Sequence, residues 1–163
     1  MGAIMNADHV RLLVYDFDGV LTDNSVILRE DGLESVVVNR SDGLAMRMLR
    51  REGFKQIIFT TEKKGAAITR ARKLGIPIAS GLADKKAALV SYCKKWRIPL
   101  ECVMYVGNDV NDLEAMKIAG YTACPADAYK EIREIAKVVL RTKGGHGVAR
   151  ELLTKLQRRK RTT

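Results

Sequence analysis

Short apolar runs alternate with amphipathic stretches along most of this chain, and this alternation restricts the fold more than any other feature. The first apolar run is VRLLVYDF at residues 10–17, and similar runs follow at residues 55–61, 76–80, 102–109 and 121–126. Such continuous runs are typical of buried parallel strands. Stretches with helical spacing lie between them, at residues 42–53, 63–75, 84–97 and 110–120. The alternation predicts an α/β fold, with a mostly parallel central sheet flanked by helices.

A β-hairpin is predicted directly after the first strand. The dipeptide Asp31-Gly32 lies between SVILRE and ESVVVN, and Asp-Gly between two β-rich runs is a strong turn signal. Residues 128–136, 137–140 and 147–156 complete the chain.

Length and composition indicate one domain. The 163 residues are 47% hydrophobic and 29% charged, which suits a globular chain large enough to bury a core. We expect a single domain over residues 1–154 and a basic tail over residues 155–163. No apolar stretch is long enough to cross a membrane, and the first residues lack a signal-peptide pattern. The three cysteines have no Cys-x-x-Cys spacing, so a disulfide framework is not expected, and we predict a cytoplasmic protein.

The net charge of +10 is a feature shared with nucleic-acid-binding proteins. Half of the excess comes from five basic residues near the C-terminus, which are Lys155, Arg158, Arg159, Lys160 and Arg161. Blocks of like charge are usually solvated and disordered, and the remaining excess is scattered. We therefore do not expect nucleic acid as a partner, whereas a basic body would attract an anionic substrate.

Polar side chains gather where three predicted strands end. Asp16 and Asp18 follow the first strand, residues 60–63 follow the second, and residues 108–112 follow the fourth. Ligands of open α/β sheets bind beyond the carboxyl ends of the strands. The sequence therefore places a candidate site at that edge of the sheet.

The pair Asp16 and Asp18 suits a reaction in which two carboxylates have different tasks. One can attack an electrophile while the other moves a proton or supports a metal. The alternative is an acidic loop that caps a turn or a helix, which is common for Asp-Gly.

The cluster GNDVND adds oxygen ligands at another strand end. Asn108, Asp109 and Asp112 suit Mg²⁺ rather than zinc, although one of them could instead cap a helix. Thr60 offers a hydroxyl at a strand end, and Lys85 offers a cation at a helix start. A hydroxyl, a lysine and Mg²⁺ are what a phosphoryl group needs as charge develops on it. Taken singly, Thr60 would be an ordinary strand residue and Lys85 a surface lysine.

Together, the series DFDGVLTD at residues 16–23, Thr60, Lys85 and GNDVND at residues 107–112 resembles the four motifs of the haloacid dehalogenase superfamily of phosphatases. The resemblance covers nearly the whole chain and implies a Rossmann-like fold and a Mg²⁺-dependent phosphatase. It implies that Asp16 is the nucleophile that forms an aspartyl-phosphate. Asp18 is then the general acid that protonates the leaving alcohol and later activates water, while Thr60 and Lys85 hold the phosphoryl oxygens.

The same resemblance implies that Asp16, the backbone carbonyl of Asp18 and a residue of the fourth motif hold the metal. Many relatives have Asp directly after the glycine of that motif, whereas this chain has Asn108, followed by Asp109. The ligand is therefore the Asn108 amide oxygen, the Asp109 carboxylate, or both. Asp112 is expected behind the metal site. Asp23 matches no catalytic position and is interpreted as a turn residue.

The spacing of the motifs leaves no room for an inserted cap domain, since only a hairpin and a helix fit between Asp18 and Thr60. This organisation resembles the capless branch of the superfamily. That branch contains 3-deoxy-octulosonate 8-phosphate phosphatases, sialic-acid-type nonulosonate 9-phosphate phosphatases and the C-terminal domains of some CMP-sialate synthetases. The resemblance implies a homotetramer in which the hairpin and C-terminal segment of a neighbouring subunit close the site.

The choice of substrate depends on residues around the second motif. Octulosonate enzymes typically have Thr-Gly-Arg there and Arg-Asp-Gly after the hairpin, whereas this chain has TTEK at residues 60–63 and Ser-Asp-Gly at residues 41–43. These residues resemble the sialate-associated members more closely. The candidate substrate-binding residues are Thr61, Glu62, Lys63, Arg40, His146 and Arg150. The last two are either contacts to a sugar carboxylate or surface residues near a helix terminus.

The leading hypothesis is a phosphatase acting on a nonulosonate 9-phosphate, and the first alternative is 3-deoxy-D-manno-octulosonate 8-phosphate. A second alternative is a non-catalytic oligomerisation module like some synthetase C-terminal domains. The intact set Asp16, Asp18, Thr60 and Lys85 argues against it. A third is a nucleic-acid binder driven by the basic tail, whose binding would depend steeply on salt.

Overall fold

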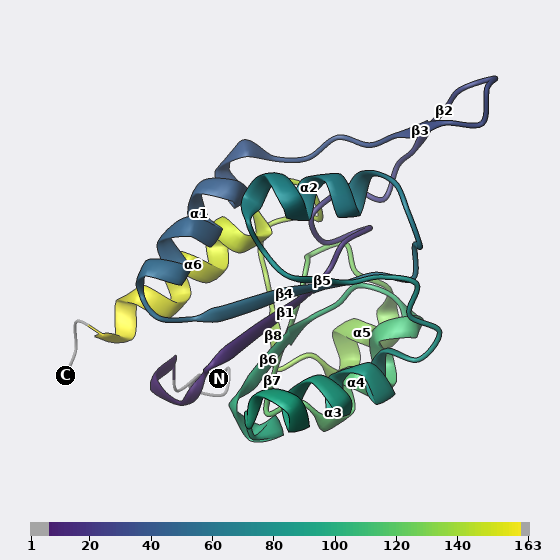
Figure 1. Cartoon of the computed structure of the whole chain (residues 1–163). Coiled ribbons are helices and arrows are strands. Elements are labelled where there is room, and N and C mark those ends of the chain that lie inside the picture. The colour runs from purple at the N-terminus through teal and green to yellow at the C-terminus, as the bar shows by residue number, and fades with distance from the viewer. Residues whose placement is uncertain (1–6, 161–163) are drawn as a thin grey trace.

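A six-stranded parallel sheet forms the centre of the molecule, in the order β5-β4-β1-β6-β7-β8 (Figure 1). The computed structural model describes residues 7–160, with the backbone alone for residues 7 and 157–160. The strands are β1 (Leu12–Asp16), β4 (Lys55–Phe59), β5 (Ile78–Ala79), β6 (Val103–Val106), β7 (Tyr121–Cys124) and β8 (Val138–Val139). The predicted α/β class and the five predicted strands are confirmed. The sixth, β8, lies in a segment to which the sequence pattern assigns no element.

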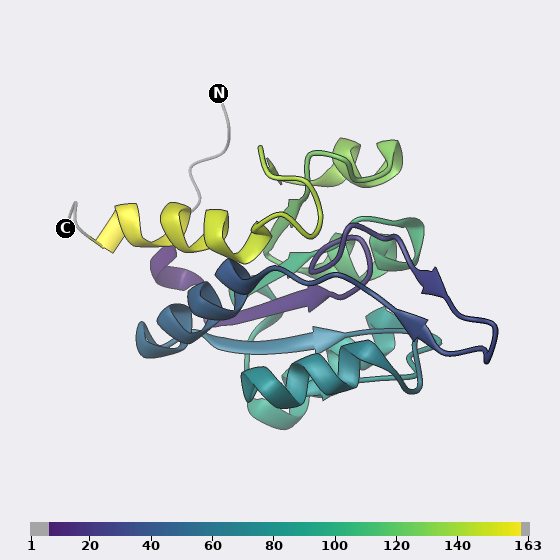
Figure 2. The ribbon, with the colours of Figure 1, turned by 90° about the horizontal axis from the view of Figure 1, so that it is seen from above.

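Helices cover both faces of this sheet (Figures 1 and 2). One layer consists of α1 (Arg40–Arg51), α2 (Ala66–Leu74) and α6 (Val148–Lys160), and the other of α3 (Lys85–Trp96), α4 (Leu113–Ile118) and α5 (Lys130–Ile135). The described part of the chain also contains three short 3₁₀ helices: η1 (Ala7–His9), η2 (Leu100–Cys102) and η3 (Val110–Asp112). Among the described helices, none is long and apolar enough to cross a bilayer.

Strand β1 lies at the centre of two cores. Its five residues are all buried, and successive side chains point to opposite faces of the sheet. Leu13 and Tyr15 pack with α1, α2 and α6, whereas Leu12 and Val14 pack with α3, α4 and α5. This two-sided burial explains why the first strand is a nearly continuous apolar run.

Side-chain caps fix where the helices near the sheet edge begin. The Asn39 side chain accepts a hydrogen bond from Ser41 N at 2.8 Å at the start of α1. The Asp84 side chain accepts one from Ala87 N at 2.9 Å at the start of α3. Such caps satisfy amides that have no partner within the helix. The cap on α3 makes Lys85 the first residue of that helix.

The predicted hairpin, β2 (Ile27–Leu28) and β3 (Glu34–Ser35), is present and projects from the body of the molecule (Figure 2). It is the element between β1 and α1, and only α2, β5, α3 and η2 lie between β4 and β6. Neither segment holds an inserted domain. At the C-terminus, α6 continues to Lys160, into the segment predicted as a basic tail. Residues 161–163 of that tail lie outside the described part of the chain.

Candidate active site

The ends of β1, β4 and β6 bring the predicted motifs together at one edge of the sheet. Asp16 pairs in register with Phe59, so Thr60 follows beside the end of β1. Tyr15 pairs with Val106, which brings the loop after β6 to the other side of β1. Within the sheet, β4 is the neighbour of β1 on one side and β6 is its neighbour on the other, so the strand order reverses direction at β1. The site therefore lies at the topological switch point, where open α/β sheets bind ligands.

Lys85 links the carboxylates of two motifs. Its Nζ lies 2.8 Å from Asp16 Oδ1 and 2.8 Å from Asp112 Oδ1. The three residues are 3%, 6% and 0% exposed, respectively. The Tyr105 hydroxyl donates a further hydrogen bond to Asp112 Oδ1 at 3.0 Å. Lys85 is therefore not a surface lysine but the cation of a buried triad.

Charge in this triad is unbalanced, because two carboxylates face one ammonium group. The pKa of Asp16 is raised to about 8, because burial and the Asp112 carboxylate raise it more than Lys85 lowers it. For Lys85, burial lowers the pKa, but the two carboxylates outweigh this effect and raise the pKa overall. A second cation beside Asp16 would favour its ionised form.

Asp112 also orders the loop after β6. Its Oδ2 accepts hydrogen bonds from Asn108 N at 3.0 Å and from Asp109 N at 3.4 Å. Gly107 is required at the start of this loop, because a Cβ there would lie 2.6 Å from the Asp112 Cβ. These contacts join Asp112 to the loop that carries Asn108, and its role behind a metal site stays a prediction.

Asn108, and not Asp109, faces the first motif. One terminal atom of the buried Asn108 amide lies 3.0 Å from Asp16 Oδ2 and 3.0 Å from the backbone oxygen of Asp18. If this atom is nitrogen, it donates two hydrogen bonds, and if it is oxygen, three oxygens face one another. Three converging oxygens repel one another unless a proton or a cation lies between them, and hard oxygen donors suit Mg²⁺.

The residues present therefore fit a divalent cation. Within residues 7–160, no three His, Cys, Asp or Glu side chains are arranged to hold a metal, but this oxygen set includes an amide and a backbone carbonyl. Gly19 leaves the space that the set needs, since a Cβ there would lie 2.0 Å from Asn108 Nδ2. Asp109 instead caps η3, and its Oδ1 accepts from Val110 N at 2.7 Å.

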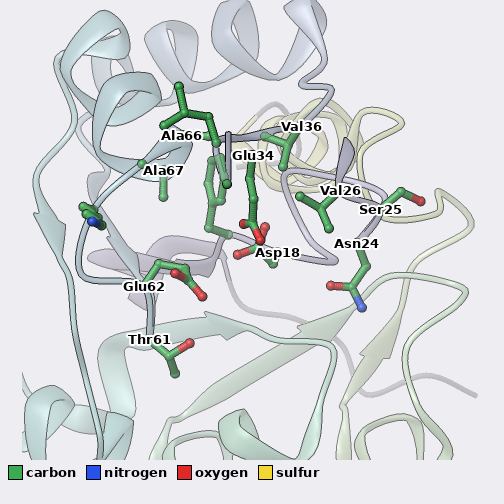
Figure 3. Close-up of a pocket in the computed structure, with 15 residues that line it drawn as sticks. Asp18, Asn24, Ser25, Val26, Glu34, Val36, Thr61, Glu62, Ala66 and Ala67 are labelled. Carbon is green, nitrogen blue, oxygen red and sulfur yellow. The ribbon is translucent and has the colours of Figure 1, made fainter. Parts of the chain in front are cut away.

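A cavity of about 810 Å³ opens beside Asp18 (Figure 3). Its walls come from the loop after β1, the hairpin and the segment from Thr61 to Ala67. Among the described residues that line the cavity, three are acidic, namely Asp18, Glu34 and Glu62. The one basic residue among them is Lys64. Burial raises the pKa of Asp18, and the Glu62 carboxylate raises it further. A raised pKa favours the protonated form that a general acid needs.

Thr60 is buried and directly precedes Thr61 and Glu62, which line the cavity. Its Oγ1 accepts a hydrogen bond from Glu62 N at 3.1 Å, which fixes the turn that carries Thr61 and Glu62 to the cavity wall. Its own hydroxyl hydrogen remains for a ligand, as a hydroxyl both accepts and donates.

Four of the predicted substrate-binding residues do not line this cavity. They are Arg40, Lys63, His146 and Arg150. Arg40, His146 and Arg150 are exposed, and His146 Nδ1 lies 2.7 Å from its neighbour, the Gly144 carbonyl oxygen. Whether they contact a substrate bound to another subunit stays a prediction.

Sequence reasoning missed two residues that shape the site. Glu34 reaches the cavity from β3, and the buried Thr22 organises the loop after β1. Thr22 Oγ1 accepts from Gly19 N and from Asn24 N, each at 3.2 Å. A threonine three residues after a glycine is a signal for such a side-chain-capped turn, and the motif DFDGVLTD contains it.

Comparisons with known proteins point to one group. The family model for haloacid dehalogenase-like hydrolases matches residues 43–152. The Escherichia coli 3-deoxy-D-manno-octulosonate 8-phosphate phosphatase is 33% identical over 91% of this chain and 80% of its own length. The corresponding phosphatase from Moraxella catarrhalis, solved with magnesium, phosphate and a KDO molecule, superposes with a TM-score of 0.89. It has 31% identity and covers 93% of this chain and 88% of the other.

A third relative is much longer than this chain. N-acylneuraminate cytidylyltransferase A from Danio rerio is 30% identical over 87% of this chain, but the match spans only 34% of the relative. The chain thus corresponds to about a third of that protein.

Proposed function

Because the chain belongs to the haloacid dehalogenase-like hydrolases, we propose that its phosphatase reaction is the Mg²⁺-dependent hydrolysis of a nonulosonate 9-phosphate through an aspartyl-phosphate. The family match and the relatives indicate that the chain is a phosphoric monoester hydrolase that resembles the octulosonate phosphatases. The observation that carries the mechanism is the convergence of Asp16, Asp18, Lys85 and Asn108 at one strand edge.

In the first proposed step, an Asp16 carboxylate oxygen attacks the phosphorus atom. The bond from phosphorus to the sugar oxygen breaks, and the leaving oxygen takes a proton from Asp18. Lys85 and the Thr60 hydroxyl stabilise the charge on the phosphoryl oxygens. The first products are the free sugar and an acyl phosphate, the aspartyl-phosphate, on Asp16.

In the second step, water hydrolyses that acyl phosphate. Asp18, now ionised, takes a proton from the water as its oxygen bonds to phosphorus, and the bond from phosphorus to Asp16 breaks. Inorganic phosphate leaves, and both aspartates return to their starting states.

A Mg²⁺ ion held by Asp16, the Asp18 carbonyl and Asn108 would supply positive charge to the phosphoryl group. Asn108 contributes no charge of its own, so the remaining compensation comes from Lys85. Asp109 caps η3, and we therefore propose Asn108 as the ligand from the fourth motif.

The residues of the cavity wall favour, as substrate, a sugar acid with many hydroxyl groups. Glu34 and Glu62 accept hydrogen bonds from hydroxyls but repel a carboxylate. We therefore propose that the polyol chain of the substrate lies between them, and that its carboxylate lies towards Lys64 at the mouth. The longer chain of a nine-carbon acid reaches past these glutamates more readily than that of an eight-carbon acid. The octulosonate phosphate is the second candidate, because several relatives carry that activity in their names.

We further propose a homotetramer in the cytoplasm. The hairpin projects from the body (Figure 2) and exposes apolar side chains, since Ile27, Leu28 and Leu33 are 62%, 70% and 60% exposed. An exposed apolar surface of this kind marks a protein contact, and a second copy of the chain is the proposed partner. The three cysteines are free, which suits a reducing compartment.

Phosphate release from a substrate panel tests the function. We expect turnover of nonulosonate 9-phosphate, with a lower kcat/KM for octulosonate 8-phosphate and hexose phosphates. EDTA should abolish release and added Mg²⁺ should restore it, because the oxygen set needs a cation. Preference for the eight-carbon acid would assign the second candidate. No release from any substrate by a folded, Mg²⁺-binding protein would favour a non-catalytic module.

Substitution of two hairpin residues tests the proposed tetramer. We expect Ile27→Ser with Leu28→Ser to convert the tetramer to smaller species, because the double change removes the apolar surface of the contact. The mass is measured by light scattering. Replacing the exposed Arg29 and Asp31 by serine at the tip of the same hairpin serves as the control. A tetramer that survives the first pair would contradict the role of the hairpin.

A further inference from the structure

The loop of residues 143–147, which precedes α6, packs against residues 19–23, which follow Asp18. Gly145 N donates a hydrogen bond to the Val20 carbonyl oxygen at 3.0 Å. A Cβ on Gly144 would lie 2.1 Å from the Gly19 carbonyl oxygen and 2.9 Å from that of Thr22. Backbone therefore contacts backbone with no flexible side chain between them, so a shift of the 143–147 loop must displace residues 19–23.

The other side of residues 19–23 faces the candidate metal site. Gly19 is so close to the Asn108 amide that a Cβ would lie 2.0 Å from Nδ2. Asn108 in turn faces Asp16 and the backbone oxygen of Asp18. One layer of backbone thus separates the 143–147 loop from the oxygens that hold the proposed cation.

Asp42 of α1 fixes the helix that follows this loop. Its Oδ1 accepts hydrogen bonds from Ala149 N at 2.9 Å and from Arg150 N at 3.3 Å. These amides belong to the first turn of α6 and have no acceptor within the helix. Gly147, immediately before α6, has no side chain that could cap it. The cap therefore comes from a residue 107 positions earlier, and its charge also suits the helix N-terminus.

The burial of Asp42 is costly. The residue is 3% exposed, and within the described residues its Oδ2 has no hydrogen-bond partner. Burial raises the pKa of Asp42 to about 6, which reflects the free energy required to keep the charge there. A helix that needed only a cap could obtain one at lower cost from a solvent-exposed side chain. The buried contact instead joins α1, just after the hairpin, to the segment that packs on the site.

We propose that Asp42 is a positioning residue for the phosphatase reaction. By capping α6 it holds the 143–147 loop against residues 19–23, and so keeps Asp18 and Asn108 in place. This proposal rests on the proposed function for its effect on rate, whereas its effect on the loop is independent of any substrate.

Asp42→Ala is expected to lower kcat by about 10- to 100-fold, because small misplacements of reacting groups have effects of this size. KM should change much less, since Asp42 does not line the cavity. Asp42→Asn keeps an oxygen acceptor at the same place and should restore most of kcat. Both rates are measured with saturating substrate and Mg²⁺, and are corrected for the folded fraction determined by urea unfolding.

Amide hydrogen exchange supplies the second measurement. In Asp42→Ala, the amides of Gly145 and Ala149 should exchange at least about tenfold faster than in the wild type. The control is Ile98→Ala, which removes a buried side chain from the core on the other face of the sheet, away from α1 and α6. It should destabilise the fold without altering kcat or the exchange of Gly145.

Three outcomes would overturn the proposal. Unchanged exchange in Asp42→Ala would show that Asp42 does not hold the loop. Faster exchange with unchanged kcat would show that the loop does not position the site. An equal loss of kcat in Ile98→Ala would reduce the effect to general stability. If the wild type releases no phosphate from any substrate, the proposed function fails, while the exchange measurement still decides whether Asp42 holds the loop.

Discussion

Asp16→Asn is expected to lower kcat by about 10⁴-fold or more, because an amide cannot serve as the nucleophile that this mechanism requires. The exchange keeps the size of the side chain and removes its negative charge beside Lys85, where Oδ1 now lies 2.8 Å from Nζ. Phosphate release measures the loss. Rapid acid quenching with labelled substrate should leave label on wild-type protein and none on the variant.

The same motif provides a matched control for this exchange. Asp23 is exposed, and its Oδ1 accepts a hydrogen bond from the nearby Ser25 N at 2.9 Å. Asp23→Asn should therefore leave kcat within about a factor of two, since an amide oxygen can accept the same bond. If Asp16→Asn retained more than about one hundredth of the wild-type kcat, another group would have to be the nucleophile.

Lys85→Met is expected to reduce the free energy of unfolding by about 3–5 kcal/mol, because it leaves two buried carboxylates without their cation. Asp16 and Asp112 are 6% and 0% exposed, so water cannot replace the ammonium group. Methionine preserves most of the side-chain volume, which limits the change to charge and hydrogen bonds. Urea unfolding without divalent metal measures the effect, and kcat should fall by about 10²-fold or more in parallel.

A second substitution separates the effect of charge from that of packing. Adding Asp112→Asn to Lys85→Met removes one of the two uncompensated charges, so part of the lost stability should return. Lys86→Met, at the adjacent exposed position, should change stability by less than about 0.5 kcal/mol. An equal effect at both lysines, or no recovery in the double variant, would contradict the buried triad as the cause.

Much of the fold was predictable because the sheet is parallel and buried on both faces. Such strands are apolar throughout, as in β1, and their ends are marked by polar residues. Strand β8, Val138–Val139, escaped prediction because it follows α5 after only two residues with no Gly or Pro between them, whereas the equally short β5 is flanked by Gly75 and Gly81. The gathering of Asp16, Thr60 and Asn108 followed from strand direction alone.

The finer arrangement of the site depends on contacts that no local pattern contains. The sequence left Asn108 and Asp109 as equal candidates, and the difference arises because η3 uses Asp109 as its cap. Glu34 lines the cavity because its side chain lies beside Asp18 (Figure 3), and periodicity does not predict that direction. The cap that Asp42 makes on α6 links residues 107 positions apart, which only the packing of α1 on α6 determines.

The position of β1 within the sheet has a consequence for how the chain folds as it leaves the ribosome. β1 is made first, yet it pairs with β4 and with β6, and α1 packs on α6, the last helix. During synthesis β1 can pair on one side once β4 has emerged, and on the other once β6 has emerged, whereas the face of α1 that packs on α6 stays uncovered until α6 follows. Long-range contacts of this kind slow folding and expose aggregation-prone intermediates. We therefore expect the face of α1 to be the last large apolar surface of these elements to be buried.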